Sequence, residues 1–155
     1  MSMNDLEQAI QLLEAGAIEA DFIGPQPEYR IRLAEKILGL SLPPTYRQFL
    51  QRLGLGGIGG VEFFGLIQDD FENSGIPDAI WLTLKRRREW AAPHAYIFVS
   101  ETGDGGDYVI DTSQVNIDGD SPVLECWAAT EAAENGMFVA EDFGAFLLGK
   151  AQGVL

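Results

Sequence analysis

The spacing of apolar residues changes near residue 61 of this 155-residue chain, and this change constrains the fold more than any other feature. Up to that point apolar side chains recur every three or four residues, as on one face of a helix. From Val61 onward, short runs rich in β-branched and aromatic residues alternate with turns of Gly and Asp, which is typical of strands. The chain therefore begins with helical segments, and strand-forming segments appear from Val61 onward.

Capping and breaking residues such as Asn4, Gly39, Pro44 and Gly54 mark the ends of the first helices. The predicted helices are Asp5 to Ala17, a segment with Ile31, Ala34 and Ile37 on its apolar face, Thr45 to Leu53, a segment that begins at Pro77 and carries Lys85 to Arg88 in its last turns, and Glu141 to Lys150. The predicted strands are Val61 to Ile67, Tyr96 to Glu101, Tyr108 to Thr112 and Val123 to Ala128.

The strands predict antiparallel pairing. Residues 102–107 form a connection of hairpin length, and its glycines permit positive φ. Regular strand-helix-strand repeats are missing, which excludes a doubly wound parallel sheet and indicates the α+β class. An apolar content of 46% supplies one core, and no linker divides the chain. We expect a single domain over residues 1–155, with a mainly antiparallel sheet packed against several helices.

The net charge is −14, from 24 acidic and 10 basic residues. Contacts with phosphates need cations, so this charge disfavours nucleic acids and anionic membranes as partners. The acidity is uneven, since residues 89–155 hold 12 of the acids and only one cation, Lys150. Such an imbalance favours a negative face that would steer a basic macromolecule. The first 20 residues lack the pattern of a secretory signal, and no apolar run is long enough to span a membrane, so we expect a cytoplasmic protein.

Motifs that could carry chemistry are weak. Gly54-x-Gly56-x-x-Gly59 matches the dinucleotide pattern, but a helix enters it and a strand leaves, the reverse of the required order. The single Cys126 excludes an internal disulfide and, with the single His94, a structural zinc site of the usual kind. Neither residue lies in a recognisable catalytic motif. We therefore predict no catalytic, cofactor-binding or metal-binding residues.

The stretch from Ala34 to Leu50 resembles a family signature. It contains, in order, Glu35, Leu38-Gly39, Leu42-Pro43, Tyr46 and Phe49-Leu50, and paired glycines follow at Gly56-Gly57. Residues 103–108, Gly-Asp-Gly-Gly-Asp-Tyr, are similar to the glycine-acid hairpin of the same family. The resemblance is to the SUKH superfamily, in its Smi/Knr branch, and it covers most of the chain.

This resemblance implies an α+β domain without catalytic residues. Bacterial members of the family are often immunity proteins that bind and neutralise a cognate polymorphic toxin, commonly a nuclease. We expect inhibition by occlusion, in which an acidic surface covers the basic cleft of the toxin. The predicted partner-binding residues are exposed acids and two aromatic anchors: Asp69, Asp70, Glu72, Trp90, Asp104, Asp107, Tyr108, Asp118 and Asp120.

Two other functions stay open at this point. Some relatives act as signalling or assembly modules, so a non-catalytic regulatory scaffold that binds a cellular protein is the first alternative. The second is a small metal-dependent hydrolase that uses the acids between Asp104 and Asp120. Their spacing does not fit a calcium loop, and Asp and Gly are ordinary turn residues, so the hydrolase is the weaker alternative.

Overall fold

The computed structural model describes residues 2–16, 18–127 and 136–155 of the chain. It has the α+β architecture expected from the sequence. The helices are α1 (Ser2–Glu14), α2 (Glu28–Leu38), α3 (Pro44–Arg52), α4 (Ala79–Trp90) and α5 (Phe143–Gln152), with a short 3-10 helix at Phe71–Asn73. The strands are β1 (Ala20–Phe22), β2 (Gly56–Ile58), β3 (Val61–Phe63), β4 (Tyr96–Glu101), β5 (Asp107–Asp111), β6 (Val123–Cys126) and β7 (Met137–Ala140).

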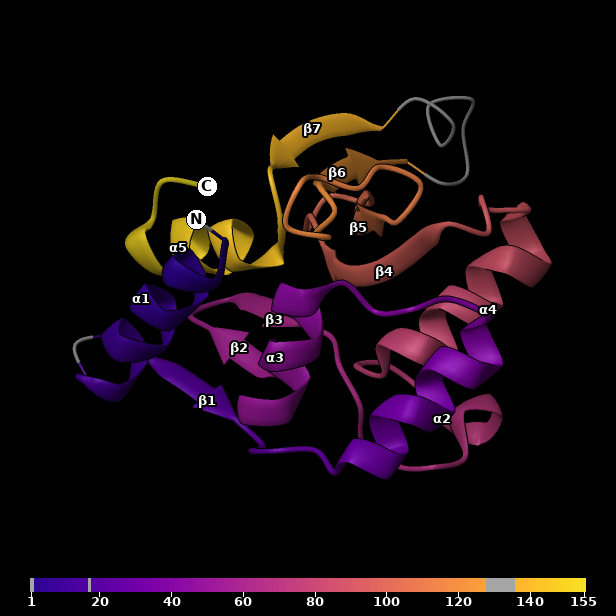
Figure 1. Ribbon diagram of the computed structural model, residues 1–155, viewed down its shortest axis with the longest axis horizontal. Coiled ribbons are helices and arrows are strands. Elements are labelled where there is room, and N and C mark those ends of the chain that lie inside the picture. The colour runs from indigo at the N-terminus through magenta and orange to yellow at the C-terminus, as the bar shows by residue number, and fades with distance from the viewer. Residues whose placement is uncertain (1, 17, 128–135) are drawn as a thin grey trace.

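The strands form one seven-stranded sheet whose spatial order equals their order along the chain. Every neighbouring pair is antiparallel, which confirms the pairing predicted from the hairpin-length turns. Helices α1 and α5 lie side by side at one end of the molecule, close to both termini, and α2 and α4 lie at the other end (Figure 1).

Helices cover both faces of the sheet. Phe63 on β3 and Tyr108 on β5 point to α5, where their ring centroids lie 5.7 and 4.9 Å from that of Phe146. Phe98 on β4 points to the opposite face, where the guanidinium of Arg86 on α4 lies 5.9 Å from its ring. Because side chains alternate along a strand, each strand contributes to two packed layers.

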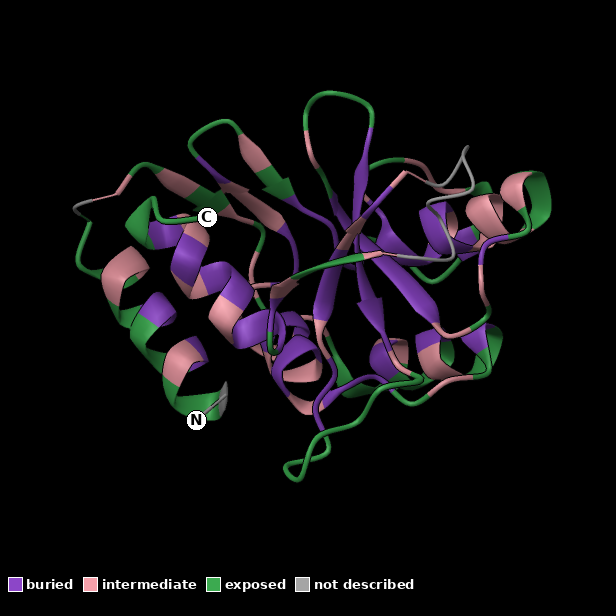
Figure 2. Ribbon diagram, turned by 90° about the horizontal axis from the view of Figure 1, so that it is seen from above, coloured by how far each residue is buried: buried purple, intermediate pink, exposed green. Residues whose placement is uncertain are grey.

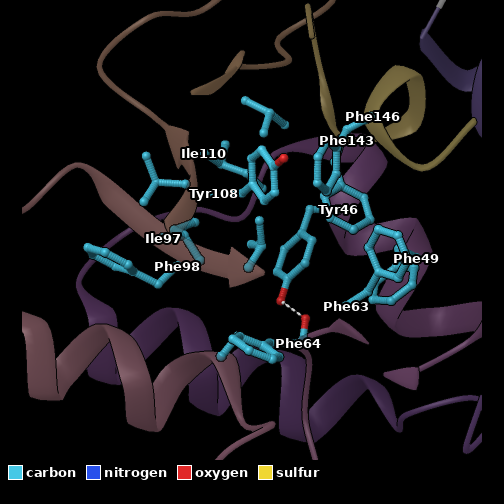
Figure 3. Packing of buried hydrophobic residues seen from close by; sticks show 14 of the residues in the cluster. Tyr46, Phe49, Phe63, Phe64, Ile97, Phe98, Tyr108, Ile110, Phe143 and Phe146 are labelled. Carbon is cyan, nitrogen blue, oxygen red and sulfur yellow. Dashed lines mark hydrogen bonds between the residues drawn. The ribbon is translucent and has the colours of Figure 1, made fainter. Parts of the chain in front are cut away.

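An aromatic cluster fills the layer between the sheet, α3 and α5 (Figure 3). The rings of Tyr46 and Phe49 lie 4.9 and 4.8 Å from that of Phe143. The hydroxyl of Tyr46, which is fully buried, donates a 2.8 Å hydrogen bond to the Phe64 carbonyl. Buried residues run along the strands through the centre of the molecule, whereas the exposed ones gather at its outer loops and helix faces (Figure 2). One continuous core therefore joins the sheet to both helix layers.

The structure corrects several predicted boundaries. The strand expected over Val61 to Ile67 ends at Phe63, because Gly65 leaves β4 and instead forms a bridge with Asp78. On α2, Leu38 is buried and Ile37 is 38% exposed, so Ile37 does not belong to the inner face. Strands β1, β2 and β7 were not predicted. The predicted helix end at Ala17 and strand end at Ala128 lie outside the described residues.

Candidate partner-binding groove

Acidic side chains stand in one row across the α4 side of the sheet. Strand register pairs Asp21 on β1 with Gly57 on β2, and Gly57 with Glu62 on β3. The pairing of Phe63 with Ser100 brings Glu62 level with Glu101 at the end of β4, and Glu101 pairs with Asp107 on β5. Residues at matched positions of adjacent strands share a face, so these acids line up although they come from four separate segments.

A groove runs along this row where α4 no longer covers the sheet. It consists of two adjoining hollows of about 470 and 360 Å³, which share Glu62 and Ile76. Ile23 and Ile76 stand at the groove with 56% and 50% of their surface exposed. The first hollow is lined by Asp21, Ile23, Leu55, Gly56, Gly57, Gly59, Glu62, Ile76 and Pro77, and the second by Gly60, Glu62, Phe64, Ile76, Glu101 and Gly103.

The groove is negative because its acids have no cationic partner. All ten Lys and Arg residues belong to the described part of the chain, and none forms an ion pair with Asp21, Glu62 or Glu101. No Lys or Arg lines either hollow. Three carboxylates beside two exposed isoleucines form a surface suited to basic and apolar side chains of a partner.

The fourth acid of the row, Asp107, differs from the other three because it is buried. Its carboxylate lies 3.5 Å from Nε of Arg86, an ion pair without hydrogen-bond geometry. The guanidinium of Arg86 stacks on the ring of Trp90, 3.7 Å from its centroid. Burial raises the pKa of Asp107, while the charge of Arg86 opposes this shift. The row of acids therefore ends under α4 in the ion pair of Asp107 and Arg86. The other three acids of the row lie in the open groove.

The glycines of the 54–59 motif have backbone roles. Gly54 follows α3 with φ +80°, and its N–H donates to the Phe49 carbonyl. A Cβ on Gly56 would lie 2.1 Å from the Asp21 carbonyl oxygen, so only glycine permits β1 and β2 to approach this closely. Gly59 takes φ +58° in the β2–β3 turn. This motif therefore ends a helix and shapes the floor of the groove.

Three of the predicted partner-binding acids lie on the exposed loop between β3 and α4. Asp69, Asp70 and Glu72 are all exposed. Arg30 on α2 donates a 2.7 Å hydrogen bond to Asp69 and lowers the pKa of that carboxyl, and the hydroxyl of Tyr29 donates a second bond at 3.1 Å. Asp69 is thus held against α2, whereas Asp70 and Glu72 form no ion pair within the part of the chain that the structure describes.

Asp104, Asp118 and Trp90 lie apart from this loop. Asp104 is exposed at the tip of the β4–β5 hairpin, where it accepts a hydrogen bond from the Thr102 hydroxyl. Asp118 is exposed in the turn before β6. Trp90, at the end of α4, is half-buried because one face of its ring carries Arg86. The structure thus spreads these residues over the surface instead of gathering them into one site.

The structure buries the remaining three predicted residues. Asp107 and Asp120 are each 1% exposed and Tyr108 is 9% exposed. Tyr108 packs on α5, where its hydroxyl accepts a hydrogen bond from Lys150, and Asp120 binds Thr45 at the start of α3. Each side chain is used inside the fold, so it presents little surface for direct contact. Partner binding stays a prediction, and it now concerns the five exposed acids and the half-buried Trp90.

Sequence reasoning missed Asp21, Glu62 and Glu101, which line the groove. They lie far apart along the chain, and only strand register brings them together. One signal was present, since Glu62 stands between Val61 and Phe63 in a strand, where alternation predicts an outward-facing side chain.

The acids between residues 104 and 120 do not gather around a metal position. Asp111 accepts hydrogen bonds from the backbone and hydroxyl of Ser113, and Asp107 and Asp120 have the partners given above. Within residues 2–16, 18–127 and 136–155, no group of three or more His, Cys, Asp or Glu residues could hold a metal ion. Burial, followed by the charge of Asp107, raises the pKa of Cys126 to about 12, so its thiol stays protonated and unreactive at neutral pH.

Comparison with known families agrees with this fold. The family model described as SUKH_6, SMI1-KNR4 cell-wall, matches residues 28–147. The protein therefore belongs to the SUKH family, whose members interact with other proteins. Helix α1 and strand β1, which carries Asp21, precede the matched residues. No curated protein matched the sequence. Across the described residues, no helix has both the length and the apolar character needed to cross a membrane.

Proposed function

We propose that this protein is an immunity protein that binds a cognate protein toxin in the cytoplasm and occludes the active site of that toxin, a nuclease domain with a basic surface. The observation that carries this proposal is the groove in which Asp21, Glu62 and Glu101 have no cationic partner among the described residues. Nucleases hold phosphates with Lys and Arg, so their clefts have the complementary charge.

Long-range charge would set the rate of association. A net charge of −14 attracts a basic domain at long range, and such steering can raise association rates to about 10⁸–10⁹ M⁻¹s⁻¹ at low salt. Salt screens the attraction, so the association rate should fall as ionic strength rises. The dissociation rate, which depends on desolvated contacts, should change much less.

Affinity would come from a desolvated patch of roughly 800 Å² on each partner. Within the groove, Ile23 and Ile76 are the exposed apolar anchors. A partner arginine placed between Glu62 and Glu101 would gain charge-assisted hydrogen bonds while its stem covers the apolar rim. The loop acids Asp70 and Glu72 extend the negative surface beyond the groove.

The experiment is a capture from the native host with three purified forms of the protein. One is the natural chain, the second carries Glu62→Lys and Glu101→Lys in the groove, and the third carries Glu14→Lys and Glu141→Lys. Glu14 and Glu141 are exposed residues outside the groove linings. Both variants change the net charge equally, so a difference between them reports position and not total charge.

We expect the natural chain and the Glu14/Glu141 variant to retain a protein that is toxic to cells when expressed alone. The groove variant should lose most of it, with an association rate reduced at least roughly tenfold at low salt. Equal retention by both variants, or a captured protein without toxicity, would contradict the proposal. In the second case a regulatory scaffold becomes the better interpretation.

A further inference from the structure

Helix α2 carries an exposed apolar stripe in addition to the face that it buries. Tyr29, Leu33 and Ile37 recur every four residues and are 53%, 39% and 38% exposed. The buried face of the same helix consists of Ile31, Ala34 and Leu38. The Tyr29 hydroxyl also binds Asp69, yet more than a third of each of the three residues stays exposed. Exposed apolar rows of this kind mark interaction sites.

The stripe lies between two flanks of different charge. Arg32 and Lys36 follow one side of it along the helix and are both exposed. On the other side stands the loop after β3, where Asp69 is already bound by Arg30. Lys36 has no ion-pair partner among the described residues, and Arg32 has only Glu28, at 3.5 Å. The cationic flank is therefore available to a ligand.

The surface is hollowed along the stripe. Two adjoining hollows of about 290 and 370 Å³ share Leu33 and Lys36. Tyr29 lies at the end of the first, and the second extends to Ile37 and Phe71. These hollows share no residue with the acidic groove. The α2 stripe is thus a separate surface with apolar and cationic character.

The dimensions of the stripe match a single helix. The eight residue-to-residue steps from Tyr29 to Ile37 rise about 12 Å along α2, which equals roughly two turns of a docked helix. A stable contact between folded domains needs about 800 Å² on each side, more than the three partly exposed apolar side chains of the stripe supply. A second copy of this chain would also bring another 14 negative charges.

We propose that the α2 stripe binds an amphipathic helix of a second protein partner, with the apolar side chains of that helix on Leu33 and Ile37 and its acidic side chains beside Arg32 and Lys36. This partner differs from the basic domain assigned to the groove. The protein would then connect two partners of opposite charge.

The test uses two synthetic helical peptides of about 18 residues, both with leucines at i, i+4, i+7 and i+11. One carries Glu along a flank of the stripe and the other carries Lys at the same positions. Binding of labelled peptide to the full chain is measured by fluorescence anisotropy. The net charge of −14 favours the Lys peptide at long range, so a preference for the Glu peptide can come only from the local surface.

We expect the Glu peptide to bind at least roughly tenfold more tightly than the Lys peptide. Leu33→Glu should abolish this binding, and Lys36→Glu should reverse the preference. Ile117→Glu is the matched control, because Ile117 is a fully exposed apolar residue in the turn before β6 that lines neither hollow of the stripe, and it should change nothing. Circular dichroism checks that each variant is folded. Preference for the Lys peptide, absence of binding by both peptides, or equal loss with Ile117→Glu would overturn the proposal.

Discussion

The carboxylate of Asp120 accepts hydrogen bonds from the backbone N–H of Thr45 at 3.3 Å and from its hydroxyl at 2.9 Å, across 75 residues of chain. Helix α3 begins after Pro43, whose side chain cannot cap the free N–H groups of the first turn. Asp120 fills this role from the turn before β6. The Asp-Gly-Asp sequence, which resembles a surface turn, thus fastens the sheet to the start of α3.

Replacing Asp120 should therefore weaken the whole fold. We expect Asp120→Ala to lower the free energy of unfolding by about 1–2 kcal/mol, as for the loss of a helix cap. Asp118→Ala, in the same turn but exposed, should change it by less than about 0.5 kcal/mol. Urea unfolding followed by circular dichroism measures both values. Equal effects of the two substitutions would show that Asp120 does not cap α3.

A second buried carboxyl, Asp142, predicts a dependence of stability on pH. Its Oδ1 accepts a hydrogen bond from the Ala145 N–H at the start of α5, while Oδ2 has no hydrogen-bond partner among the described groups. Burial raises the pKa of Asp142 to about 6, the Ala145 bond opposes this, and the charges of Asp120, Glu141 and Asp5 add to it. The folded protein thus holds this proton more tightly than the unfolded chain.

The stabilisation that Asp142 contributes is fully present below about pH 4, the ordinary pKa of Asp, and it is lost as pH rises through about 6. Asp142→Asn keeps a capping oxygen without the charge, so the variant should gain stability relative to the natural chain between pH 4 and pH 7. Urea unfolding at both pH values gives the difference. If the two proteins differ in free energy of unfolding by the same amount at both pH values, Asp142 is not the source of the pH dependence. Other buried acids such as Asp78 are present in both proteins, so their contributions cancel in this comparison.

The pair of Arg86 and Asp107 predicts an asymmetric response to mutation. Their side chains are 12% and 2% exposed. Arg86→Met leaves an uncompensated carboxylate in the interior, which should cost about 3 kcal/mol. Adding Asp107→Asn removes that charge and should recover part of the loss. Arg88→Met, on the exposed side of the same helix, should be nearly neutral. If the double variant is less stable than Arg86→Met alone, the buried charge is not the cause.

Gly65 predicts a strict requirement for glycine where the chain leaves β3. A Cβ there would lie 1.7 Å from the Gly54 carbonyl oxygen, a backbone atom that cannot move aside. We expect Gly65→Ala to lower the free energy of unfolding by at least about 3 kcal/mol or to prevent folding. At Gly60 a Cβ would meet nothing within 4 Å, so Gly60→Ala should be neutral or stabilise by up to about 1 kcal/mol. Soluble yield and thermal unfolding distinguish the two variants.

The helices and the fold class could be predicted because their signals are local. Apolar spacing and the helix-opening Pro44 mark α3, and Gly39 adopts the left-handed conformation expected at the end of α2, with φ +69°. Strands β1 and β2 have only three residues each, and β2 contains two glycines, so neither shows a strand pattern. Such short strands form because their neighbours in the sheet supply hydrogen bonds.

The candidate site depends on relationships that no local pattern contains. Asp120 has the same sequence surroundings as an exposed turn residue, but the distant start of α3 buries it. Asp107 stands beside the β4–β5 turn, and only the position of Arg86 on α4 shows that it is enclosed. Conversely, Asp21 and Glu62 look like isolated surface acids until strand register places them in one groove.

The meandering order of the sheet has a consequence for biosynthesis. Each strand pairs only with the strand made just before or after it, so the sheet can grow from β1 to β7 as the chain leaves the ribosome. Helix α1 cannot finish in the same way, because it packs against α5, which follows all seven strands along the chain. Helix α1 can therefore complete its packing only after α5 has been made. A chain that ends prematurely within α5 would leave the apolar face of α1 open to aggregation and proteolysis.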